Sequence, residues 1–133
     1  MLLLAALALR LIIAYVLLPK SGFESDLGTF TAWALRMVDV GPGGFYAEPG
    51  LSDYPPAYMY VLWLIGSVGK ILGAADGTDV ERTTALLKIP PILADIACGW
   101  LLYVVTLRWF GDRPRATTLA LAAAALYLFN PVT

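Results

Sequence analysis

Residues 1–19 read MLLLAALALRLIIAYVLLP, an apolar run that only Arg10 interrupts. A helix of about 18 residues, rising ~1.5 Å per residue, just crosses the hydrocarbon core of a bilayer. A cleaved signal peptide is the alternative, but it would carry basic residues before its apolar region and small residues at its cleavage site. No charge precedes Arg10, and residues 16–19 are bulky. The run therefore favours a retained membrane-spanning helix over about 2–19.

Arg10 lies near the middle of this predicted span. A charged side chain at that depth is unfavourable, so we expect Arg10 to face a protein interior or a water-filled cavity. The alternative is an arginine near a helix end whose aliphatic part stays in lipid while its guanidinium reaches the interface.

The rest of the chain contains further long apolar runs. Hydrophobic residues make up 59% of the 133 residues, and their runs are too long for a globular core of this size to bury. We expect an all-α, multi-pass transmembrane bundle with about four spans, forming one domain over 1–133 that is truncated at its C-terminus. The spans are expected at about 2–19, 57–73, 84–107 and 116–131.

Local residues support the later spans. Tyr58 and Trp63 near the start of 57–73 are typical of an aromatic belt at the membrane interface. Pro90 and Pro91 should kink or restart the third helix near its entry, because proline lacks an N–H and clashes with the preceding turn. A polar link at 74–82 precedes that helix. Basic residues are equally frequent in the two loops that must lie on opposite sides, so charge alone leaves the orientation open.

The first loop, residues 20–56, contains a helix of its own. Leu27, Phe30, Ala34 and Met37 recur at helical spacing and predict a helix over about 26–39, which the sequence GPGG at 41–44 should end. Membrane spans on both sides favour an amphipathic helix at the membrane surface, and an ordinary soluble amphipathic helix is the alternative.

Composition excludes several classes of function. The chain has no histidine and one cysteine, Cys98, so a histidine-dependent triad, a disulfide framework and a thiolate metal site within these residues are excluded. A net charge of −1 gives no basic surface for nucleic acid. Proton transfer would therefore use carboxylates, lysine or tyrosine.

Two aspartates lie where the first loop meets the expected spans. Asp26 is at or next to the start of the surface helix, where the helix dipole favours the ionised carboxylate. Asp53 comes just before two prolines that stiffen the backbone. Both could line one cavity at the membrane face. The alternatives are a helix cap for Asp26 and a turn residue for Asp53.

Three other ionisable residues have weaker signals. Glu24 and Asp26 form an acid-x-acid pair that leaves a divalent metal, Mg²⁺ or Mn²⁺, open as a cofactor, with none certain. Lys88 and Asp95 are seven residues apart on the third helix and could meet partners on other helices. Snorkelling of Lys88 and a buried interhelical hydrogen bond of Asp95 are the alternatives.

Taken in order, these segments resemble a known enzyme superfamily. Residues 27–34 read LGTFTAWA, GP follows at 41–42 and FY at 45–46, and DYPP at 53–56 opens a span. This order resembles the GT-C integral-membrane glycosyltransferases, especially mannosyltransferase-like members and the dolichyl-phosphate-glucose-dependent glucosyltransferases of asparagine-linked glycan assembly. The likeness covers nearly the whole chain, and members are typically several times longer, so this piece alone should be inactive.

The resemblance implies an inverting transfer of mannose or glucose from a polyprenyl-phosphate donor to a glycan, lipid or protein acceptor. It makes Asp26 the catalytic residue and places the first loop outside the cytoplasm of a cell-membrane protein. Five residues are then expected to bind substrate, the arginines through the leaving phosphate: Glu24, Asp53, Tyr54, Arg10 and Arg36.

A segment of a membrane transporter or flippase is the competing interpretation, in which Arg10, Lys88 and Asp95 would line a path. A transporter should concentrate acids near mid-membrane, but five of the ten acids lie in the first loop. A small scaffold protein of the membrane is the third possibility.

Overall fold

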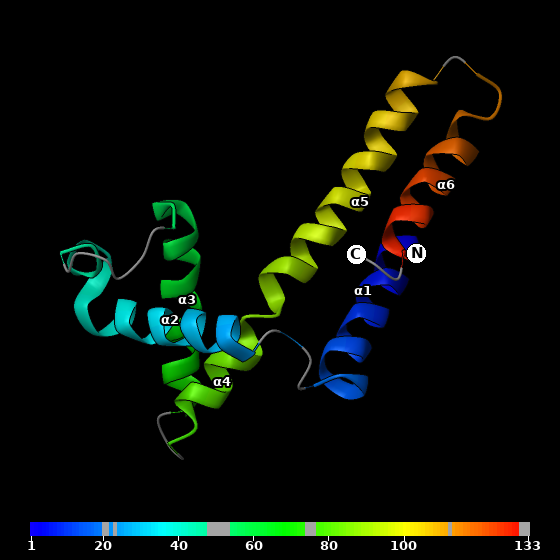
Figure 1. The fold of residues 1–133 in the computed structure, drawn as a ribbon. Helices are drawn as coiled ribbons and strands as arrows, with labels where there is room; N and C mark the ends of the chain where they lie inside the picture. Colours follow the sequence, from blue (N-terminus) through cyan, green and yellow to red (C-terminus); the bar gives the residue numbers. More distant parts are fainter. Residues whose placement is uncertain (20–21, 23, 48–53, 74–76, 112, 131–133) are drawn as a thin grey trace. The chain divides into compact units, whose positions relative to one another are not determined.

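The computed structural model describes residues 1–19, 22, 24–47, 54–73, 77–111 and 113–130 (Figure 1). In these ranges the regular structure is helical, which confirms the all-α class, and no strand occurs there. The elements are α1 (Leu2–Ile12), the π-helical turn η1 (Ile13–Leu17), α2 (Glu24–Phe45), α3 (Pro56–Gly73), α4 (Asp79–Leu86), α5 (Ile89–Trp109) and α6 (Ala116–Leu128).

The chain forms two compact units. The first unit combines Met1–Ser21 with Ile89–Thr133 and contains α1, α5 and α6. The second unit is Gly22–Lys88 and contains α2, α3 and α4.

In the second unit, α2 packs against α3 and α4 (Figure 1). The predicted apolar stripe of α2 is confirmed, because Ala34 and Met37 are buried and Leu27 and Phe30 pack against the core. Burying such side chains is the main favourable term in folding. The buried core consists of Ala34, Met37, Phe45, Met59, Leu62, Ile65 and Leu87.

Close helix packing in this unit depends on glycines of α3. A Cβ on Gly66 would lie 2.3 Å from the carbonyl oxygen of Ala34 in α2, and one on Gly73 would lie 2.3 Å from the backbone nitrogen of Asp79. Both distances are far shorter than van der Waals contact, so only glycine lets these backbones approach.

The surface helix is longer than its predicted range of about 26–39. It begins at Glu24, and the GPGG sequence interrupts it at Gly41 (φ 73°, ψ 163°) without ending it. Glycine adopts this left-handed φ without strain, and Pro42 then fits the first turn of a new helical segment that reaches Phe45. The GPGG sequence therefore produces a kink.

The expected third helix is divided. The helix α4 begins at Asp79, inside the segment 74–82 that was predicted to be a polar link, and ends at Leu86. The new helix α5 starts at Ile89, with Pro90 and Pro91 in its first turn. N–H groups in the first turn have no partner within the helix, so proline costs no helical hydrogen bond there. The predicted restart at the tandem prolines is confirmed.

In the first unit, α5 packs along α6, and α1 contacts both (Figure 1). The buried residues of α6 recur every fourth position, at Ala116, Ala120, Ala124 and Leu128. Gly99 of α5 receives Leu128, since a Cβ there would lie 2.5 Å from its Cδ2. Small residues thus allow close helix packing.

One helical stretch in the described part of the chain, Asp79–Trp109, is long and apolar enough to cross a membrane. The stretches Leu2–Leu17 and Ala116–Leu128 are apolar but shorter. Such a helix is weak evidence for membrane association, and the four-span topology stays a prediction.

Candidate functional site

Asp26 lies in the first turn of α2 and is exposed. Its carboxylate Oδ1 accepts a hydrogen bond of 3.3 Å from the Ser25 hydroxyl. At this position the carboxylate lies near the unpaired N–H groups of the helix start. Asp26 is the third residue of the helix, and the position before the helix start lies outside the described residues, so a capping role stays an alternative.

Aromatic rings gather beside the stripe of α2 that carries Asp26. Phe30 lies with its ring centroid 5.7 Å from that of Trp33, 5.4 Å from that of Tyr54 and 5.7 Å from that of Tyr58. These are edge-to-face contacts, the favourable arrangement for aromatic quadrupoles. We call the whole group the aromatic cluster; it consists of Phe30, Trp33, Phe45, Tyr46, Tyr54 and Tyr58.

Tyr54 precedes α3 and contacts three other rings of the cluster, those of Phe30, Trp33 and Tyr58. Its ring lies 5.7 Å from that of Trp33 and 6.2 Å from that of Tyr58, yet its side chain remains 43% exposed. The Tyr46 hydroxyl donates a hydrogen bond of 3.2 Å to the Tyr54 carbonyl oxygen. These contacts fix the position of Tyr54 while part of the residue stays exposed to solvent.

Helix geometry puts Asp26 next to this cluster. Asp26, Phe30 and Trp33 are spaced i, i+4 and i+7, so their side chains leave α2 along one stripe. Glu24 precedes Asp26 by two residues and leaves the helix about 160° away. The two acids therefore do not converge, and among the described residues no three Asp, Glu or Cys side chains gather to hold a metal.

Two other predicted binding residues belong to the same unit. Arg36 follows Trp33 by three residues on α2 and is partly buried. Asp53 lies outside the described residues, so a pocket shared by Asp26 and Asp53 stays a prediction. Tyr54, which directly follows Asp53, is the part of DYPP that the structure brings to the cluster.

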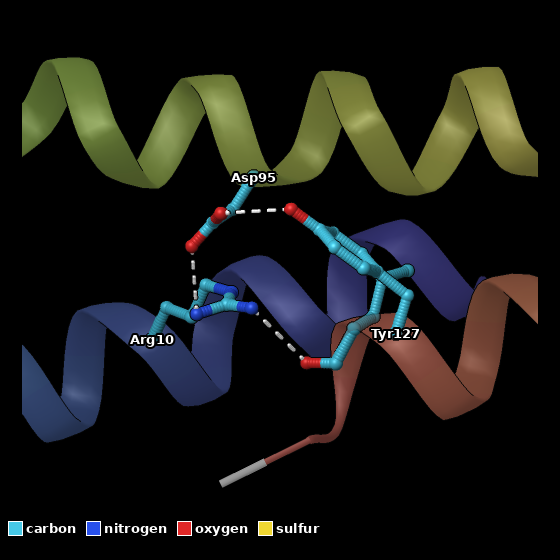
Figure 2. Close-up of polar contacts among 4 residues, drawn as sticks. Arg10, Asp95 and Tyr127 are labelled. Carbon is cyan, nitrogen blue, oxygen red and sulfur yellow. Dashed lines mark hydrogen bonds and ion pairs between the residues drawn. The ribbon is translucent and has the colours of Figure 1, made fainter. Parts of the chain in front are cut away.

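Arg10 belongs to the other unit, where Figure 2 shows its contacts. Its Nη1 forms an ion pair of 3.0 Å with Oδ2 of Asp95 on α5, and its Nη2 donates a hydrogen bond of 3.4 Å to the Leu128 carbonyl oxygen. The Tyr127 hydroxyl donates to Oδ1 of Asp95 at 3.2 Å. The Arg10 side chain is 12% exposed, so it faces a protein interior as predicted.

Arg10 was expected to bind the phosphate of the substrate. In the structure its guanidinium instead forms an ion pair with Asp95 of another helix. It also supplies Asp95 with a partner from another helix, one of the arrangements the sequence left open. Lys88 lies in the break between α4 and α5, so it shares no continuous helix face with Asp95.

The aromatic cluster is the feature that sequence reasoning missed. Tyr58 was assigned to an interfacial belt by its place at the start of a span, and the ring contacts with α2 were not expected. The signal was present in the spacing of Asp26, Phe30 and Trp33, which predicts one stripe.

Comparison with protein-family models, with curated proteins and with solved structures gives no match to this chain.

Proposed function

We propose that this chain belongs to a membrane glycosyltransferase, and carries its catalytic residue, that moves a hexose, mannose or glucose, from a polyprenyl-phosphate donor with inversion. The observation that carries the proposal is the exposed Asp26 carboxylate on the same stripe of α2 as Phe30 and Trp33 of the aromatic cluster. An acid beside open aromatic rings suits a sugar substrate, which presents hydroxyls at its edges and C–H groups on its faces.

Asp26 acts as the general base in this proposal. It removes the proton from the acceptor hydroxyl as that oxygen forms a bond to C1 of the hexose, and the bond from C1 to the phosphate oxygen breaks on the opposite face. The electron pair of the broken bond leaves with the polyprenyl phosphate. A carboxylate is a weak base, so positioning must contribute much of the rate.

The aromatic cluster is proposed to hold the sugar that reacts. Tyr54 and Tyr46 are the members whose exposure leaves ring surface available, at 43% and 44%. Arg36, on the same helix, is the proposed cation for the leaving phosphate, because guanidinium matches phosphate oxygens bidentately.

A membrane location accords with the exposed apolar surface. Trp109, Leu126 and Ile71 are 75–80% exposed, and side chains of this kind occur on both units. Soluble monomers rarely expose extended apolar patches, and a lipid-linked donor requires access from the bilayer. We therefore propose a multi-pass arrangement of the helices. The resemblance to the GT-C glycosyltransferases implies that the loop with Asp26 lies outside the cytoplasm.

Transfer from defined donors tests this function. The full-length protein in lipid vesicles is incubated with polyprenyl-phosphate mannose, polyprenyl-phosphate glucose or the corresponding nucleotide sugars, together with a mixture of lipid-linked glycan acceptors. We expect a product only with a polyprenyl-phosphate sugar, with its anomeric configuration inverted. Transfer from a nucleotide sugar alone, or retention of configuration, would contradict the proposal.

A further inference from the structure

Apart from Arg108 in the last turn of α5, the charged residues of the three helices in the first unit lie at one place. Arg10 is the charged residue of α1, Asp95 is the acid of α5, and α6 carries no charge. These two charges meet at 3.0 Å, and α6 adds the Tyr127 hydroxyl and the Leu128 carbonyl oxygen (Figure 2). We call this group the polar cluster. Each of the three helices contributes to it.

The groups of the polar cluster satisfy one another's hydrogen-bonding requirements. Asp95 accepts from Arg10 through Oδ2 and from Tyr127 through Oδ1, so both carboxylate oxygens are engaged. The Leu128 carbonyl is in the last turn of α6, where carbonyl groups lack a helical donor. Arg10 Nη2 supplies that donor, and its positive charge suits the negative end of the helix dipole.

The helix that contributes Arg10 is a poor membrane span by itself. At ~1.5 Å per residue, the apolar stretch Leu2–Leu17 covers roughly 24 Å of a hydrocarbon core of about 30 Å. It also carries a guanidinium that is unfavourable in lipid unless paired. Snorkelling does not account for Arg10, because its guanidinium points to Asp95.

We propose that the polar cluster is the docking site that holds α1 in the bilayer, and that Asp95 on α5 is what allows α1 to stay there. The first helix of the chain then becomes a stable membrane element only once α5 and α6 have been made. This inference concerns assembly; it rests on the proposed membrane location but not on the proposed sugar transfer.

The test measures whether α1 leaves its place when Asp95 is removed. Ala6 is fully buried and lies one turn before Arg10, so Ala6→Cys in a Cys98→Ser background puts a single reporter thiol on α1. The full chain is reconstituted in vesicles of phosphatidylethanolamine and phosphatidylglycerol. The rate at which a water-soluble maleimide labels the thiol is then followed.

We expect Asp95→Leu to raise the labelling rate by about 10-fold or more, because Arg10 is left as an unpaired charge among apolar helices. The double variant Arg10→Leu/Asp95→Leu should return labelling to the starting rate, since it removes both charges together. Asp39→Asn is the matched control, because it breaks an exposed ion pair with Lys70 in the other unit and should leave labelling unchanged. Unchanged labelling of Asp95→Leu, or equally fast labelling of the double variant, would overturn the proposal.

Discussion

Gly69 of α3 lies against Thr83 of α4 so closely that a Cβ on Gly69 would be 2.1 Å from the Thr83 hydroxyl oxygen. Thr83 is completely buried, so it has little room to move. Together with Gly66, which faces α2, this contact fixes the distance of α3 from both neighbouring helices. Because Phe30 comes from α2 and Tyr58 from α3, that spacing also shapes the aromatic cluster.

The substitution Gly69→Ala should destabilise the second unit by about 1–3 kcal/mol, since the added methyl must push α4 away or strain Thr83. Gly28→Ala is the control, because a Cβ at Gly28 meets nothing within 4 Å and alanine is the better helix former. Thermal unfolding of the full chain in detergent measures both variants. A native midpoint for Gly69→Ala would show that α3 and α4 are not packed as described.

The substitution Tyr54→Ala should raise KM for the sugar donor or acceptor by roughly 2- to 10-fold, the range expected for the loss of one aromatic contact. Tyr54→Phe keeps the ring and should stay near native. Tyr60→Ala is the control. Tyr60 is a 57% exposed tyrosine of α3 that is not part of the aromatic cluster. Steady-state kinetics of the three variants distinguish sugar binding by the cluster from a general effect of losing a tyrosine. An equal rise in KM for Tyr60→Ala would contradict sugar binding by the aromatic cluster.

The ion pair between Lys70 and Asp39 should contribute little to stability. Its side chains are 48% and 59% exposed, and exposed pairs of this kind are typically worth below about 1 kcal/mol. Lys70→Met should therefore change the unfolding midpoint only slightly, and added salt should reduce even that difference. A large loss of stability in Lys70→Met would mean that this pair joins α2 to α3 more strongly than its exposure indicates.

The sequence predicted the helices better than their boundaries. The stripe of Leu27, Phe30, Ala34 and Met37 defined the buried face of α2, because a period of 3.6 residues can be counted without a structure. The continuation of α2 beyond Gly41 could not be predicted, because glycine and proline at 41–42 are equally compatible with a stop and with a kink.

The candidate site was predicted in part. The place of Asp26 in the first turn followed from local sequence, but the divergence of Glu24 did not, because the predicted helix began at about 26 and left Glu24 outside it. The partner of Arg10 could not be identified, because Asp95 is far away in the sequence and only tertiary packing brings it to 3.0 Å. The ring contacts of Tyr54 depend on the same kind of long-range packing.

The rate of hexose transfer by Asp26→Asn, measured with a polyprenyl-phosphate donor beside Glu24→Gln, tests the proposed role of Asp26 most directly. Asparagine keeps the size of the side chain and cannot accept the proton, so the rate should fall by about 10²- to 10⁴-fold while unfolding in detergent stays native. Glu24→Gln, an exposed acid in the same turn on another face of α2, should keep a near-native rate. Transfer by Asp26→Asn at the native rate would contradict a catalytic role for this carboxylate.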